Sequence, residues 1–135
     1  MKLKDKYNDL SNLYSEYIVL IKSGNFYLTF GDSAKIMNYL FSYQIINEKL
    51  GFPLNSLDKV SDLLNTKKIN YLIYDDDSNT YDFGEDNKYL DTLNEVEQFD
   101  YNNLLEKMLL NKIKYLIKKD FSNYLKIKDF VDGIK

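Results

Sequence analysis

The side chains of this sequence that could do chemistry are carboxylates, lysines and aromatic rings, because its 135 residues include neither cysteine nor histidine. Their absence excludes thiol nucleophiles, disulfide bonds, zinc sites built from Cys and His, and histidine general bases. Serine–histidine hydrolysis is excluded with them. All eighteen basic residues are lysine, so no side chain can make the two-pronged hydrogen bond of arginine to phosphate or guanine.

The densest group of carboxylates lies in residues 75–86. Their oxygen-bearing side chains match positions 1, 3, 5 and 12 of an EF-hand calcium loop. However, position 6 is Thr80 instead of glycine, and position 12 is Asp86 instead of the longer glutamate. We therefore favour a solvated acidic turn over a calcium loop.

The same carboxylates are poor candidates for acid–base catalysis, because adjacent solvated acids lack the contrasting environments that separate two pKa values. The five glycines are also too scattered to form a phosphate-binding loop. The sequence thus predicts a protein that is not an enzyme and that has no cofactor and no metal site.

The net charge of −3 conceals a strong asymmetry along the chain. Residues 1–74 carry nine lysines against seven acids, residues 75–100 carry one against ten, and residues 101–135 carry eight against four. The central segment alone makes the chain acidic, while both flanking regions are basic. An anionic partner such as DNA is therefore compatible with the charge.

No part of the sequence suggests a membrane. The longest uninterrupted apolar run, residues 17–21, is far shorter than the ~20 residues that cross a bilayer as a helix. No apolar segment typical of a signal peptide follows the first lysines. We expect a cytoplasmic protein.

The elements that must position these side chains alternate between helices and strands. This alternation favours an α/β fold (α+β in the stricter sense), with a mixed sheet flanked by helices. We expect caps at Asp32 for the second helix and at Asn55 or Ser56 for the third, and a turn at residues 50–53. The apolar periodicity predicts helices at 3–14, 34–41 and 57–64 and strands at 18–23, 26–30, 43–46 and 69–74.

We expect three parts in one domain. Residues 1–76 form the core, and residues 77–100 are an acidic surface excursion with one short strand at 80–83. Residues 101–135 form two added helices packed on the core, of which the last ends near Gly133. The longer helix has apolar residues on one face and lysines elsewhere, which we read as a solvated face in preference to a phosphate-binding one.

The most specific segment is residues 24–34, Gly-Asn-Phe-Tyr-Leu-Thr-Phe-Gly-Asp-Ser-Ala. Glycine at the first position of a two-residue loop favours a type II′ turn, so the segment predicts a tight hairpin. Phe26, Leu28 and Phe30 share one face of its second strand, and Tyr27 and Thr29 share the other. Either Phe26 and Leu28 point outward as an apolar tip, or the whole first set points into the core and the tyrosine faces water.

This segment resembles the hallmark of the MutS mismatch-recognition domain, usually written GDFYELF followed by an acidic residue and alanine. Further matches follow in order: Tyr-Ser-Glu at residues 14–16, an apolar strand leading into the motif, and Leu-Gly-Phe-Pro at residues 50–53. The resemblance extends over residues 7–76, just over half of the chain. It implies the fold of that domain, to which the C-terminal helices are an addition.

The resemblance also implies a DNA-binding module in which Phe26 enters the duplex at a weakened or mispaired step. It favours the outward orientation of Phe26 and Leu28. Asn25 stands at the aspartate of the motif, and Lys22, beside the turn, is placed to contact phosphate. Leu28 replaces the family's glutamate, which bonds the displaced base, so discrimination among mispairs is not expected.

The alternative function is a protein–protein interaction module that retains the fold without binding DNA. Leu28 in place of the acid, the −9 charge of residues 75–100 and the apolar tip favour this alternative. A homodimer through the tips or through the C-terminal helices is its simplest form.

Overall fold

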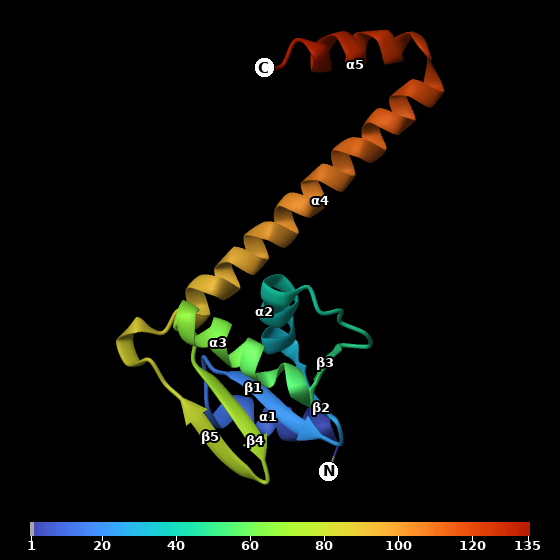
Figure 1. Ribbon diagram of the computed structural model, residues 1–135. Coiled ribbons are helices and arrows are strands. Elements are labelled where there is room, and N and C mark those ends of the chain that lie inside the picture. The colour runs from blue at the N-terminus through green and yellow to red at the C-terminus, as the bar shows by residue number, and fades with distance from the viewer. Residues whose placement is uncertain (1) are drawn as a thin grey trace. The chain divides into compact units, whose positions relative to one another are not determined.

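The computed structural model describes residues 2–135. A five-stranded mixed β-sheet with helices on both faces forms the centre of the first part of the chain, up to Val96 (Figure 1). The predicted mixed α/β class is confirmed. Met1, the first residue of the predicted core, lies outside the described residues. The elements are α1 (Leu3–Leu13), β1 (Ile18–Ser23), β2 (Phe26–Phe30), α2 (Gly31–Phe41), β3 (Lys49–Pro53), η1 (Leu54–Ser56), α3 (Leu57–Lys67), β4 (Tyr71–Asp75), β5 (Asp77–Tyr81), η2 (Gly84–Asp86), α4 (Tyr89–Lys119) and α5 (Ser122–Asp132).

The strands lie in the order β3-β2-β1-β4-β5. β1 pairs antiparallel with β2 and parallel with β4, while β3 and β5 pair antiparallel at the two edges. Because β1 and β4 run in the same direction, the turn after β1 and the turn after β4 lie at the same end of the sheet. β1 is buried on both faces over residues 18–21, as expected of a central strand with a continuous apolar run.

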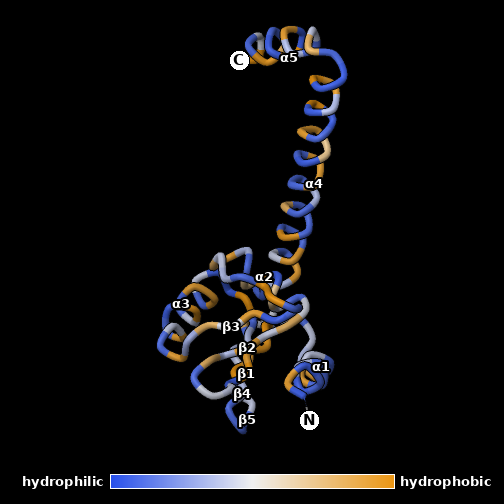
Figure 2. The backbone as a smooth tube through the Cα atoms, turned by 90° about the vertical axis from the view of Figure 1, so that its right-hand side faces the viewer, coloured by the Kyte–Doolittle hydropathy of each residue, from blue (hydrophilic) through white to orange (hydrophobic). Residues whose placement is uncertain are grey.

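Each face of the sheet has its own hydrophobic cluster. α2 and α3 cover one face, where Leu20, Tyr27 and Phe52 are buried against Met37 and Leu64. α1 covers the other face, and Figure 2 shows it on the opposite side of the sheet from α3. The α1 cluster consists of Tyr7, Leu10, Val19, Ile21, Phe30 and Leu72. Full burial of each such side chain contributes ~1.5–3 kcal/mol.

A buried serine joins the two helical layers. Tyr7 Oη donates a hydrogen bond to Ser33 Oγ (3.1 Å), and the backbone nitrogen of Val19 donates to the same oxygen (3.1 Å). Gly31 precedes this serine with φ +51°, and a Cβ there would lie 3.3 Å from the Tyr7 ring. The close approach of α1 therefore depends on glycine at the start of α2.

Hydrogen bonds of polar side chains connect the end of β5 and the start of α4 to the rest of the sheet. Asn70 Nδ2 donates to Asp82 Oδ1 (3.2 Å), and Tyr17 Oη donates to Asp82 Oδ2 (2.6 Å). Asn87 Oδ1 accepts from the backbone nitrogens of Asn70 (2.9 Å) and Tyr89 (3.1 Å). Asn87 therefore caps the first turn of α4 and holds it beside β4.

The predicted strand at residues 43–46 is wrong. These residues are irregular apart from one isolated bridge between Ile46 and Lys49, and the strand is β3, where we expected a turn. Leu50 and Phe52 of β3 alternate inward and are buried. Pro53 is tolerated because it ends an edge strand, where proline is admitted.

Two other element boundaries and both predicted helix caps differ from expectation. The edge strand covers Asp77–Tyr81 instead of residues 80–83, and α4 begins at Tyr89 instead of residue 101. Neither α2 nor α3 has a side-chain cap, because Asp32 lies inside α2, Asn55 lies in η1, and Ser56 already has helical backbone angles. The final helix ends before Gly133, as predicted.

The chain divides into two compact units. The first, which we call the sheet unit, ends at Val96, and the second, which we call the C-terminal unit, comprises Glu97–Lys135. α4 continues from one unit into the other. The packing of the C-terminal helices on the core stays a prediction.

Candidate functional site

The β1–β2 turn has the predicted geometry. Ser23 and Phe26 face each other across a two-residue loop in which Gly24 has φ +60°. Only the first of the two loop residues has a positive φ, which is the property of a type II′ turn. The carbonyl of Asn25 accepts a hydrogen bond from the backbone nitrogen of Leu54 (3.1 Å) and so ties the turn to η1.

Phe26 is the most exposed of three β2 side chains that lie on the α1 face of the sheet. Along β2, exposure rises from 7% at Phe30, which contacts the Tyr7 ring, through half-buried Leu28 to 50% at Phe26. The strand neighbours of Phe26 are Ser23 and Pro53. The α1 cluster therefore covers this face at Phe30 and leaves the aromatic ring at the turn in solvent.

The outward orientation is thus correct for Phe26, whereas Leu28 is half-buried and Phe30 is buried. The opposite arrangement is also wrong, because Tyr27 and Thr29 are buried on the α2 face. Phe30, Leu28 and Phe26 lie on the same face of β2 but differ in burial, because α1 packs over only part of that face.

Leu28 lies over Gly51 of β3. A Cβ at position 51 would be 2.8 Å from Leu28 Cδ2, closer than two carbons can approach. Glycine thus lets the leucine lie flat on the neighbouring strand. Leu28 contributes an apolar surface here, and its side chain can neither donate nor accept a hydrogen bond.

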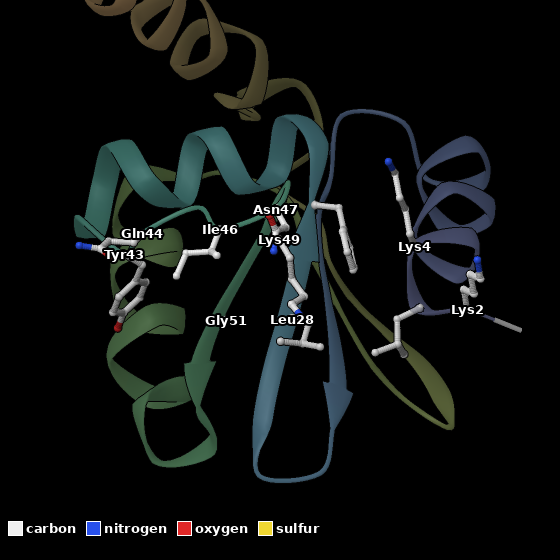
Figure 3. A pocket seen from close by; sticks show the side chains of 11 residues that line it. Lys2, Lys4, Leu28, Tyr43, Gln44, Ile46, Asn47, Lys49 and Gly51 are labelled. Carbon is white, nitrogen blue, oxygen red and sulfur yellow. The ribbon is translucent and has the colours of Figure 1, made fainter.

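A groove of about 730 Å³ extends from Leu28 toward α1 and the segment before β3 (Figure 3). Leu28, Phe30 and Gly51 line it from the sheet, and Ile46 lines it from the segment before β3. Three lysines line the same groove, Lys2 and Lys4 from the start of α1 and Lys49 from β3. The surface is therefore apolar with a cationic rim.

The charges of the rim are partly paired. Lys4 Nζ contacts Glu48 Oε2 at 2.5 Å, and this hydrogen bond and the charge of Lys4 lower the pKa of Glu48. Both side chains are exposed, so the pair contributes little to stability. In the part of the chain that the structure describes, the ion pairs leave Lys2 and Lys49 without a carboxylate partner.

An acidic turn lies at the same end of the sheet as Phe26. Residues 75–77 connect β4 to β5, and β4 lies two strands from β2, a separation of ~10 Å. Lys22 Nζ lies 3.6 Å from Asp75 Oδ2. The register pairs Lys22 with Tyr27, which places Lys22 on the face opposite Phe26.

The structure therefore brings together Phe26 and Leu28 of the predicted site, places Asn25 in the turn beside them, and separates Lys22 from them. The lysines of the groove were missed by sequence reasoning, because they come from two distant places in the chain and none belongs to the motif. The one sequence signal for these lysines is that Lys49 and Gly51 alternate along a strand and so share its face, on which Gly51 lies opposite Leu28.

The acidic segment is not a calcium loop, since Asp77–Tyr81 is an extended strand whose successive side chains point to opposite faces. Among residues 2–135, no three Asp or Glu side chains are grouped so that they could hold a metal ion. In the same residues, no helix has the length and apolar character needed to cross a membrane.

Comparison with known protein families finds no family model that matches this sequence. Comparison with curated proteins likewise finds no matching relative.

Proposed function

We propose that the sheet unit is a non-catalytic module that binds duplex DNA, with Phe26 inserted as a wedge at mispaired or otherwise weakened steps. The observation that carries the proposal is the half-exposed phenyl ring of Phe26 at the end of a tight hairpin. An apolar wedge costs a few kcal/mol of base unstacking, and this cost is smallest where pairing is already poor.

The lysine-rimmed groove supports the same proposal. It opens on the sheet face that carries Phe26, so Lys2, Lys4 and Lys49 would contact phosphates along that face. Lys49 pairs with Phe30, four residues from Phe26, so its phosphate would lie ~14 Å along the strand from the inserted ring. Phosphate contacts set position and affinity, whereas base contacts set sequence preference. With leucine at position 28, the wedge would recognise a weak step by its deformability and would not select one mispair.

The test is fluorescence anisotropy with matched, mismatched and bulged duplexes at low salt. Phe26→Ala should weaken binding to the bulged duplex about tenfold or more, because one base-stacking contact is worth ~1–3 kcal/mol. Lys49→Ala should weaken binding to all duplexes alike and lower the salt slope by about 1. Phe130→Ala, which removes an exposed phenyl ring from α5, is the matched control and should change neither property.

Protein–protein interaction is the second candidate function, and the acidic turn favours it. Asp75, Asp76 and Asp77 lie close enough to Phe26 to repel a phosphate backbone. The combined variant Asp75→Asn, Asp76→Asn and Asp77→Asn discriminates the two candidates. It should bind bulged DNA more tightly than the unmodified chain if DNA is the partner, and absence of binding to every duplex by both chains would reject DNA.

A further inference from the structure

The C-terminal unit has no core of its own. None of the residues of Glu97–Lys135, all of which the structure describes, is buried. Its two helices meet at a small contact, where Asn123 Nδ2 donates to the carbonyl of Leu116 (2.9 Å) and Ile127 is half-buried. Helices in water derive most of their stability from burying an apolar face, so this unit requires a further contact surface.

Six exposed apolar side chains lie on one face of α4, which we call the α4 stripe, and Lys112 lies on the same face between Leu109 and Tyr115. Spacings of three, four and seven residues place them on one face of the helix. The row extends over ~21 Å, given a rise of 1.5 Å per residue, and Figure 2 shows apolar bands recurring along α4 between polar ones. The α4 stripe consists of Tyr101, Leu104, Leu105, Met108, Leu109 and Tyr115.

The charges of α4 change sign at the middle of this stripe. From Glu97 to Glu106 the helix carries three acids and no lysine, and from Lys107 to Lys119 it carries five lysines and no acid. Met108 lies at the point of change. The two halves of the stripe are therefore complementary to each other in charge.

We propose that α4 pairs antiparallel with α4 of a second copy of this chain, with the two helices crossing at Met108. A two-fold interface brings each surface against itself in reverse, so residues at equal distances before and after Met108 face each other. Tyr101 and Tyr115 are each seven residues from Met108, and Glu97 and Lys119 are each eleven. Tyr101 of each copy thus meets Tyr115 of the other, and Glu97 of each copy meets Lys119 of the other, so each contact occurs twice in the dimer.

The charge pattern selects this arrangement over the alternatives. A parallel pair would set the acidic halves against each other and the lysines against each other, and like charges at such positions are destabilising. An unrelated partner would need a matching reversal of charge along its own surface. A second copy of α4 in the antiparallel direction has this reversed order of charges by its own sequence.

Sedimentation equilibrium of the full chain from low-micromolar to submillimolar concentration tests the proposal. The mass should rise from the 16.0 kDa of one chain toward twice that value. Met108→Glu places two carboxylates together at the crossing point and should raise the dissociation constant about a hundredfold or more. Asn103→Glu adds the same charge away from the stripe and should leave the dissociation constant unchanged.

Charge exchange tests the direction of the helices. Glu97→Lys alone should weaken the dimer about threefold to tenfold, the range of exposed ion pairs, and the double variant Glu97→Lys with Lys119→Glu should restore it. In a parallel dimer, residue 97 of one copy faces residue 97 of the other, so either variant would still place like charges together. A Glu97→Lys variant with an unchanged dissociation constant would therefore overturn the antiparallel arrangement.

Two further outcomes would overturn the interface itself. One is a chain that stays monomeric throughout the concentration range, and the other is a dimer that Met108→Glu leaves intact. Phe26→Ala should not affect dimerisation, so a failure here is distinguishable from a failure of the DNA-binding proposal. Far-UV circular dichroism verifies that each variant keeps its helices.

Discussion

Phe26 and Phe52 lie on adjacent strands of one sheet but differ in burial, and this difference makes the position of the wedge testable. Phe52→Ala removes a ring that is 1% exposed within the α2 face and should cost ~3–5 kcal/mol of unfolding free energy. Phe26→Ala should change it by less than about 1 kcal/mol, as surface substitutions do. Urea denaturation measures both, and a large cost at Phe26 would contradict its exposure.

Asp82 should make stability depend on pH in the acid range. The hydrogen bond from Tyr17 Oη lowers its pKa, and a second from the backbone nitrogen of Gly84 adds to the effect. A carboxyl group with a lower pKa in the folded state stabilises the fold above its unfolded pKa, and this stabilisation is lost as the pH falls through the folded pKa.

Asp82→Asn should therefore lower stability at neutral pH and flatten its decline in the acid range, below the ordinary aspartate pKa of 3.8 that the unfolded group has. Urea midpoints measured from neutral pH down through this range check the expectation. The same hydrogen bond raises the pKa of Tyr17 to about 12, so Tyr17→Phe should weaken the acid response in the same direction. A variant with the unmodified pH profile would exclude Asp82 as its source.

At the level of elements, the start of α4 depends on one asparagine. Asn87 Oδ1 accepts two backbone hydrogen bonds, and its Nδ2 donates to the carbonyl of Glu16 (3.0 Å). Asn87→Ala should therefore cost ~1–2 kcal/mol, the loss of a helix cap together with contacts to the sheet. Asn94→Ala, an exposed change within the same helix, is the control and should be near neutral in chemical denaturation.

The hairpin and both helices that flank β3 could be predicted from the sequence, because each has a local signal. Gly24 sets the turn, and apolar residues at helical spacing mark α1, α2 and α3. The site was predictable only at Phe26 and its turn. α1 packs over Phe30 but not over Phe26. This difference arises from tertiary packing, which the periodicity of the sequence does not predict.

Two errors show where local patterns mislead. Ile45 and Ile46 form an apolar pair typical of a strand, yet both are exposed, while β3 contains a glycine and a proline that argue against a strand. The first turns of α4 were predicted as a surface excursion because they contain several acidic residues. Asp91 in the first turn is favourable beside the positive end of the helix dipole, so acidity there marked a helix start instead of a loop.

At the level of the whole molecule, the two units should differ in protection of their backbone amides. β1 and β4 lie among buried side chains, whereas the C-terminal unit has none. Hydrogen exchange should therefore be slow in the central strands and fast in Glu97–Lys135 at low protein concentration. Raising the concentration should slow exchange along α4 in the unmodified chain but not in Met108→Glu.

Strong protection of α4 in a dilute, monomeric sample would contradict this expectation, because it would mean that another part of the same chain covers the α4 stripe. Slow exchange in α4 that does not change with protein concentration would contradict it for the same reason.

The strand order also bears on how the chain folds. β1 meets β2 across two residues, and β4 meets β5 across a single turn, so both hairpins can close from neighbouring residues within microseconds. The parallel seam between β1 and β4 must wait until the intervening chain has been synthesised and its long loop closed, which is entropically costly. The ribbon that presents Phe26 is therefore expected to be the earliest strand pairing of a nascent chain, formed before the sheet behind it is complete.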